Sequence, residues 1–254
     1  AFIGTLAGSI VNVSLPTLSR QFDVSIDIIA WGVLSYSLAI SATLLLVGRL
    51  AALNGYRFTY TIGFWIFTAG SLLCGLSVEI WQLIAFRSLQ GIGSAFLMAA
   101  GPALIRRAFP VGERGKGMGI LGTVVGVGLM SGPPLGGLIV STIGWRWIFF
   151  LNIPVGIFGA FYASRLLKPL SADDPDSRVD YPAWIYQAIG IIALLVFCNR
   201  VNSSEIPPIV LAGIAMLSIA GFAMFIRREQ AVAKPLLGLK IFTYREFSLA
   251  VASM

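Results

Sequence analysis

The sequence predicts an all-α protein that crosses a membrane several times. Of its 254 residues, 57% are hydrophobic and only 11% are charged, and the mean hydropathy is +0.87. Soluble globular proteins carry about 25% charged residues. The apolar residues gather in runs that are mostly long enough to cross a bilayer. Because hydrocarbon offers the backbone no hydrogen-bond partner, each run is expected to be a helix.

The sequence contains eight apolar runs and the beginning of a ninth. We place the eight at about 2–17, 29–53, 58–78, 80–105, 117–142, 147–167, 182–199 and 206–226. They predict a six-helix N-terminal part with a truncated first span (1–170), a loop (171–181), two additional spans (182–226), an amphipathic connector (227–246) and the start of another span (247–254). Since both ends lie in apolar runs, we expect the chain to be a fragment of a longer protein.

The basic residues predict how the spans are oriented. Fourteen of the eighteen Lys and Arg residues lie in alternate loops, whereas the opposite loops hold only Arg20, Arg146 and Arg200. Loops rich in Lys and Arg face the cytoplasm. We therefore expect a multi-pass protein of the plasma (or inner) membrane with these loops inside the cell. The same arrangement accounts for the net charge of +7, so we expect no nucleic-acid partner.

The fourth run contains Arg87, which is the one Lys or Arg that we place in the membrane interior, since Arg49 and Arg165 lie at the ends of their runs and are counted with the loops. Gln90 and Ser94 follow it at steps of three and four, so all three lie on one helix face. An arginine in hydrocarbon costs at least about 3 kcal/mol and normally faces a protein interior or a cavity. All eleven acidic residues fall in loops or at span ends. Asn12 and Tyr36 are further polar candidates for an internal cavity.

Glycine and proline in two stretches predict close helix approach or movement. In the fifth run, Gly128, Gly132 and Gly136 recur every four residues, so one helix face has no side chains and a second helix can approach it. Pro133 removes a backbone donor and bends the helix. The second run ends in a tight turn with two arginines. We predict gating or hinge roles for the following residues: Gly48, Gly55, Arg57, Gly128, Gly132, Pro133, Gly136 and Gly137.

Several motifs together resemble the major facilitator superfamily. The stretch 87–95 is similar to its fourth-span motif RxxQGxGxA, and the stretch 128–137 is similar to the antiporter motif GxxxGPxxGG of its fifth span. VNVSLP at 11–16, WRWIFFLNIPVG at 145–156 and PLLGLKIF at 235–242 resemble the fourteen-span drug:proton antiporter branch (EmrB/QacA type). The resemblance implies the major facilitator fold, with two extra spans between two six-helix halves. The six-helix N-terminal half should divide into two inverted three-helix repeats.

The resemblance also implies a function. Members of this branch are secondary active transporters that work by alternating access and export small amphiphilic compounds or drugs in exchange for protons. On this basis we assign five residues to the substrate and coupling cavity: Arg87, Gln90, Asn12, Tyr36 and Ser94.

The sequence departs from the family pattern at Ala7 and Ala52, where aspartates are usual. These departures favour two alternatives. One is a non-transporting sensor or degenerate paralogue on the same fold, and the other is a transporter of an anionic substrate without proton antiport.

Three hypotheses account for Arg87 in the absence of a carboxylate inside any predicted span. In the first, Gln90, Asn12 and helix carbonyls satisfy the guanidinium and hold the first and fourth spans together. In the second, a coupling carboxylate lies in a later span beyond this sequence. In the third, the guanidinium neutralises an anionic or zwitterionic substrate.

The composition argues against enzyme chemistry. The sequence has no His and only two Cys, so zinc or haem sites of the usual kind would lack ligands. Nucleophile–base sets and phosphate-loop patterns are also missing from the sequence. We therefore expect no metal, no cofactor and no enzymatic activity. The expected partners are membrane lipid, a small-molecule substrate and protons, and the expected oligomeric state is a monomer.

Overall fold

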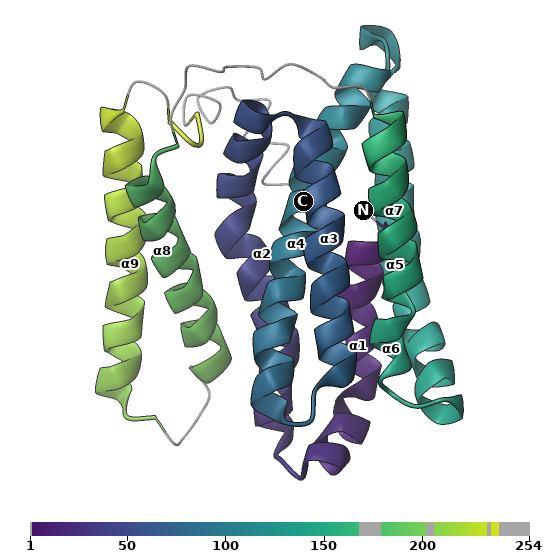
Figure 1. Cartoon of the computed structure of the whole chain (residues 1–254). Coiled ribbons are helices and arrows are strands. Elements are labelled where there is room, and N and C mark those ends of the chain that lie inside the picture. Colours follow the sequence, from purple (N-terminus) through teal and green to yellow (C-terminus); the bar gives the residue numbers. More distant parts are fainter. Residues whose placement is uncertain (1, 168–178, 202–205, 233–234, 239–254) are drawn as a thin grey trace. The chain divides into compact units, whose positions relative to one another are not determined.

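A computed structural model describes residues 2–167, 179–201, 206–232 and 235–238. Within these ranges the chain is helical and contains no strand, as predicted (Figure 1). Eight helical segments are long and apolar enough to span a membrane. The helices are α1 (Phe2–Phe22), α2 (Ile26–Asn54), α3 (Tyr56–Leu76), α4 (Ile80–Ala108), α5 (Arg114–Thr142), α6 (Trp147–Phe150), α7 (Asn152–Leu166), α8 (Tyr181–Arg200) and α9 (Pro208–Ala231). The predicted ninth span at 247–254 lies outside the described residues.

The chain divides into two compact units, residues 1–175 and 176–254. In the first unit, α4 packs between α2 and α3, while α1 packs against α5 and α3 against α7 (Figure 1). If the first three spans and the next three are inverted repeats, α1 corresponds to α4 and α2 to α5. The α1–α5 pair then corresponds to the α4–α2 pair, and both pairs are in contact. The division falls within the predicted loop 171–181, and the finer domain boundaries stay predictions.

Small residues of α3 and α4 allow α4 to lie close to both neighbours. A Cβ atom at Gly91 would lie 2.5 Å from the carbonyl oxygen of Tyr36 on α2. A Cβ at Gly70 of α3 would lie 2.7 Å from the backbone nitrogen of Gln90. Such distances leave no room for a side chain, so these glycines let the helix backbones approach. The polar face of α4 is thereby enclosed by its neighbours.

The predicted close crossing at the glycines of α5 is present, and its partner is α1. A Cβ at Gly136 would lie 2.8 Å from the carbonyl oxygen of Ile10, and one at Gly132 would overlap the side chain of Ser9. Pro133 lies on the exposed side, and a Cβ at Gly137 would make only an ordinary contact, 3.9 Å from Val13. The hinge function predicted for these positions stays a prediction.

The turn between α2 and α3 requires a glycine. Gly55 has a φ of +87°, a backbone conformation that is strained for residues with a Cβ, and its N–H donates to the carbonyl of Ala51 (3.0 Å). Arg57 follows, and its Nη2 donates to the backbone carbonyl of Ser164 on α7. Gly48 has open space around its Cβ position, so helix packing does not require it. The gating role of all three stays a prediction.

In the second unit, α8 and α9 form a closely packed hairpin (Figure 1). A Cβ at Gly221 would lie 2.8 Å from the backbone nitrogen of Gly190, and Ser218 Oγ donates to the carbonyl of Gly190 (3.0 Å). Helix α9 continues through Ala231, so the beginning of the predicted connector at 227–231 is helical. Close approach at glycines therefore joins these two helices as it joins α1 to α5.

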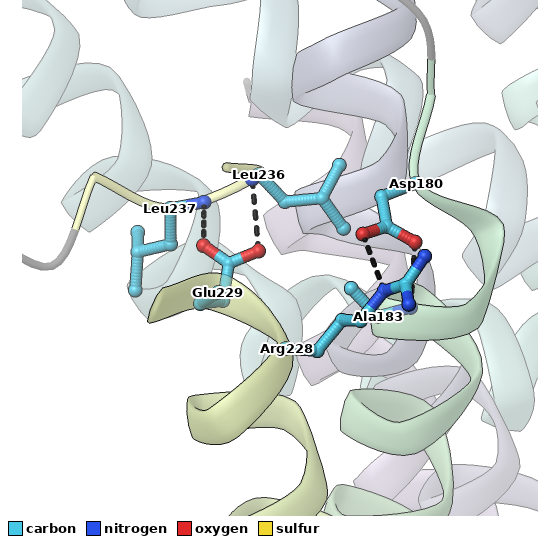
Figure 2. Close-up of polar contacts among 6 residues, drawn as sticks. All are labelled: Asp180, Ala183, Arg228, Glu229, Leu236 and Leu237. Carbon is cyan, nitrogen blue, oxygen red and sulfur yellow. Dashed lines mark hydrogen bonds and ion pairs between the residues drawn. The ribbon is translucent and has the colours of Figure 1, made fainter. Parts of the chain in front are cut away.

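Two acidic residues fix the ends of this hairpin (Figure 2). Asp180 accepts hydrogen bonds from the backbone N–H of Ala183 (3.3 Å) and from Arg228 Nε (3.0 Å), and so joins the start of α8 to the end of α9. Glu229 is 4% exposed, and its two carboxylate oxygens accept from the backbone N–H groups of Leu236 (2.9 Å) and Leu237 (2.7 Å). These bonds hold Leu236 and Leu237 against the last turn of α9.

Candidate functional site

Arg87 lies at the centre of a buried polar network in the first unit. Its side chain is 0% exposed. Nε donates to the carbonyl of Gly32 on α2 (3.0 Å), and Nη1 donates to the carbonyl of Ala7 on α1 (3.2 Å) and to Gln90 Oε1 (2.6 Å). The guanidinium carbon also lies 4.1 Å from the centre of the Tyr36 ring, a cation–π distance. Arg87 thus connects α1, α2 and α4.

The network extends to α3 through Gln90. Its Nε2 donates to Ser71 Oγ at 2.6 Å, and the Ser71 hydroxyl donates to the carbonyl of Phe67 at 2.8 Å. Both Gln90 and Ser71 are 0% exposed. Ser71 was not predicted as a site residue, although a hydroxyl within an apolar run is a signal that could have identified it.

Tyr36 forms the second branch of the network. Its hydroxyl donates to the carbonyl of Gly4 on α1 (2.6 Å) and lies 2.6 Å from Ser94 Oγ. Four of the five predicted cavity residues are therefore brought together: Arg87, Gln90, Tyr36 and Ser94. The fifth, Asn12, is exposed, and the acceptors of Arg87 include the carbonyl of Gly32 instead.

The acceptors that surround Arg87 are neutral. Two are backbone carbonyls and one is an amide oxygen, while Nη2 makes no hydrogen bond within the described residues. Neutral acceptors lower the cost of burying a charge, although they do not cancel it. The geometry supports the first of the three hypotheses, with Gly32 in place of Asn12. One of these carbonyls belongs to Ala7, the position at which the family pattern has an aspartate. Arg87 therefore contacts the backbone of this position.

A hollow of about 420 Å³ lies beside this network. It is bounded by α1, α2, α4 and α5 of the first unit. The lining residues are Gly4, Thr5, Gly8, Ser9, Asn12, Val33, Tyr36, Ser37, Ile40, Ser41, Met98 and Leu129. Asn12 and Tyr36 were predicted as cavity residues. Arg87, Gln90 and Ser94 are not part of the lining, because they are fully buried in the network.

Sequence reasoning missed most of the polar lining. Thr5 is followed by Ser9 after four residues and by Asn12 after three more, and Ser37 and Ser41 are four residues apart. These stripes are the signal that could have identified one face of each helix. Which stripe borders a hollow depends on the neighbouring helices and cannot be read from spacing.

Comparisons with known proteins agree with this architecture. The family model described as Major Facilitator Superfamily matches residues 1–250. The riboflavin transporter RibZ of Clostridioides difficile (strain 630) is 36% identical over 248 residues, which cover 98% of this chain and 53% of that protein. The multidrug resistance protein Stp of Mycobacterium tuberculosis (strain ATCC 25618 / H37Rv) is 32% identical over 257 residues, covering 100% of this chain and 47% of Stp.

A third relative is the multidrug transporter protein MdtP of Bacillus subtilis (strain 168). It is 30% identical over 250 residues, which cover 97% of this chain and 46% of MdtP. The chain thus spans about half the length of the curated relatives it matches. The match of the family model over nearly the whole chain confirms the resemblance seen in the motifs. The chain belongs to the major facilitator superfamily of membrane transporters.

Proposed function

We propose that the protein is a secondary active transporter that exports small amphiphilic compounds by alternating access, in exchange for protons. The observation that carries this proposal is the hollow of about 420 Å³ between α1, α2, α4 and α5, with the buried Arg87 network behind it. A hollow with polar and apolar walls suits an amphiphile. The names of Stp and MdtP as multidrug proteins, and of RibZ as a riboflavin transporter, support the same class of substrate.

The basic ends of the helices face the cytoplasm in this proposal, by the positive-inside rule. The close α1–α5 crossing at Gly128, Gly132 and Gly136 is the contact that changes when the hollow opens to alternate sides. The Gly55 turn with Arg57 holds the cytoplasmic end of α3 to α7. The assignment of the α1–α5 crossing follows from the packing of small residues, which lets the two helix backbones approach closely.

The proton-coupling group is assigned to a carboxylate outside the described residues. The hydrogen-bond acceptors of Arg87 within them are neutral, so the described spans supply no carboxylate partner for it. A proton can compete with an arginine for a buried carboxylate, because burial raises and the arginine lowers the proton affinity of that group. The carboxylate would then approach Arg87 in one of the two states of the transport cycle.

The neutral surroundings of Arg87 favour one other candidate function, the transport of an anionic substrate without proton antiport. A net positive charge inside the first unit attracts an anion. In this candidate, transport follows the membrane potential and is independent of a pH gradient. The complete enclosure of Arg87 weighs against direct contact with such a substrate.

Transport in everted membrane vesicles that contain the full-length protein tests the proposal. Riboflavin and ethidium serve as probes, and an acidic lumen is expected to drive their accumulation until nigericin collapses the pH gradient. Arg87→Ala should reduce accumulation by about tenfold or more, which corresponds to about 1.4 kcal/mol or more. Arg20→Ala, which alters an exposed arginine at the end of α1, is the matched control and should accumulate both probes normally.

The two candidates and the non-transporting alternative give different results. Accumulation that depends on membrane potential alone would support the anionic-substrate function. Vesicles that accumulate neither probe nor an anionic dye would support a non-transporting protein. Accumulation that is unchanged in Arg87→Ala would contradict both functional roles of Arg87, namely pairing with a coupling carboxylate and neutralising an anionic substrate. Size-exclusion chromatography of each variant checks that it folds.

A further inference from the structure

Two polar side chains in the hollow are exposed and make no hydrogen bond within the described residues. They are Asn12 on α1 and Ser37 on α2. The other polar lining groups are already engaged: the Ser9 hydroxyl lies 3.2 Å from the carbonyl of Leu6, and the Tyr36 hydroxyl bonds to Gly4 and Ser94. The amide of Asn12 offers both donors and an acceptor, and the hydroxyl of Ser37 offers one donor and lone pairs. These two residues can therefore recognise a polar edge of a ligand.

Four side chains that line the hollow are apolar. Met98 of α4 and Leu129 of α5 are 38% and 50% exposed, and both line the hollow. Val33 and Ile40 add partly buried aliphatic surface from α2. Methionine adapts its shape to flat or irregular apolar groups. A ligand with one polar edge and one apolar face would contact both the polar and the apolar lining residues.

None of the twelve described residues that line the hollow carries a charge. The charge of the network beside the hollow is that of Arg87, which contacts the ring of the lining residue Tyr36. Arg87 is 0% exposed, and its hydrogen-bond acceptors are neutral. A cationic ligand would be repelled by this charge and finds no carboxylate among these twelve residues. An anionic ligand would be attracted by the same charge, but it would lose its hydration without contacting a cation, because the guanidinium is fully buried. An uncharged ligand avoids both costs.

We infer that the hollow is a binding site for uncharged amphiphiles, with Asn12 and Ser37 as the residues that determine specificity. The polar edge of the ligand hydrogen-bonds to Asn12 and Ser37, and its apolar face packs on Met98 and Leu129. This inference rests on the proposed function and deepens it, because among amphiphiles in general it names the uncharged ones as the preferred substrates.

Binding of three fluorescent tricyclic probes to the full-length protein in detergent tests the inference. Riboflavin is uncharged, ethidium is a cation and fluorescein is an anion at pH 7.5. We expect riboflavin to bind more tightly than either charged probe. Asn12→Asp replaces the amide by an isosteric carboxylate and should raise the ratio of ethidium to riboflavin affinity by about tenfold, or about 1.4 kcal/mol.

Two further variants make the test decisive. Ser37→Asp introduces the same charge from α2 and should shift the ratio in the same direction, so the test survives if Asn12→Asp does not fold. Asn199→Asp makes the same chemical change at an exposed position of α8, outside the first unit, and should leave the ratio at the wild-type value.

Tighter binding of ethidium or fluorescein than of riboflavin to the wild type would overturn the inference. So would an unchanged affinity ratio in the folded Asp variants. Riboflavin binding that depends on Asn12, without transport in vesicles, would uphold the inference and contradict the proposed function. Transport of ethidium with no effect of Asn12→Asp would support the proposed function and overturn the inference.

Discussion

The two units of the chain bury opposite charges in different ways. In the first unit, the Arg87 cation lies within the span α4 and donates to two backbone carbonyls and an amide oxygen from three helices. In the second, the Glu229 carboxylate lies in the last turn of α9 and accepts from two backbone N–H groups just beyond the helix. Within the part of the chain that the structure describes, neither charge has an opposite charge as its hydrogen-bond partner.

The difference lies in what each charge holds together. The partners of Glu229 are close in sequence, so its effect is local and sets the path of the chain after α9 (Figure 2). Two partners of Arg87, the carbonyls of Ala7 and Gly32, are distant in sequence and lie on other helices, so disturbing the network affects the packing of several helices. We therefore expect changes around Arg87 to alter folding and function together, and changes around Glu229 to alter one short segment.

Replacing the amide next to Arg87 should have the largest effect on stability. Gln90→Leu removes one of the two acceptors of Arg87 Nη1 and the donor to Ser71, and leaves both partners buried. We expect the free energy of unfolding to fall by about 3 kcal/mol, since hydrogen bonds to buried charged groups are the costly ones to lose. Thermal unfolding in detergent measures the loss. Ser88→Ala, which removes a hydroxyl bonded to the carbonyl of Ile84 in its own helix, is the control. Equal shifts in the two variants would contradict the network.

Glycine substitutions at the helix crossings should rank second. Gly132→Ala places a methyl group against Ser9 on α1, and overpacking of this kind costs about 2 kcal/mol. Gly126→Ala, on the same helix but in open space, should be neutral or stabilising by up to about 1 kcal/mol. In the second unit, Gly221→Ala and Gly213→Ala form the equivalent pair. Thermal unfolding should separate the members of each pair, and shifts of the same sign and size would show that the crossings are not close.

Removing the carboxylate of Glu229 should have a local effect of about 1 to 3 kcal/mol, because two backbone N–H groups lose their acceptor. In Glu229→Ala, the amide hydrogens of Leu236 and Leu237 should exchange faster, while those of α1 to α5 keep their rates. Hydrogen exchange followed by mass spectrometry measures both. Faster exchange throughout the first unit would show that Glu229 acts on more than its own segment.

The smallest effect is expected at the ion pair between Arg228 and Asp180. Arg228 is 47% exposed, and pairs that face solvent contribute less than about 1 kcal/mol. Arg228→Ala should therefore shift thermal unfolding less than Glu229→Ala does, and the shift should diminish at high salt. If Arg228→Ala lowers the free energy of unfolding more than Glu229→Ala does, the ion pair of Asp180 contributes more than the buried carboxylate of Glu229, contrary to this prediction.

Much of the fold could be predicted from the sequence, because each span is an apolar run that must satisfy its own backbone. Helical spacing correctly grouped Arg87, Gln90 and Ser94 on one face of α4. The glycines of α5 predicted a close crossing but not its partner, since the pattern describes one helix only. The choice of α1 depends on a matching surface around Ser9 and Ile10 that the sequence of α5 does not contain.

The acceptors of Arg87 and the lining of the hollow could not be predicted in the same way. Backbone carbonyls such as those of Ala7 and Gly32 belong to every residue, so the sequence does not indicate which ones a guanidinium reaches. Asn12 and Ser37 differ from neighbouring polar residues only in facing a hollow, and this depends on how α1, α2, α4 and α5 pack. Polar stripes show that one face of a helix is special but not whether it meets a neighbour or a ligand.

Cysteine labelling tests the central claim most directly, namely that ligands meet the hollow while the Arg87 network stays closed behind it. The experiment uses full-length protein with Cys74→Ala, Cys198→Ala and any other cysteine removed. Asn12→Cys should react with a membrane-impermeant maleimide, and riboflavin should slow the reaction. Ser94→Cys, at a position that is 0% exposed, should stay unlabelled under the same conditions. Equal labelling of the two positions, or labelling of Asn12→Cys that riboflavin does not slow, would contradict the claim.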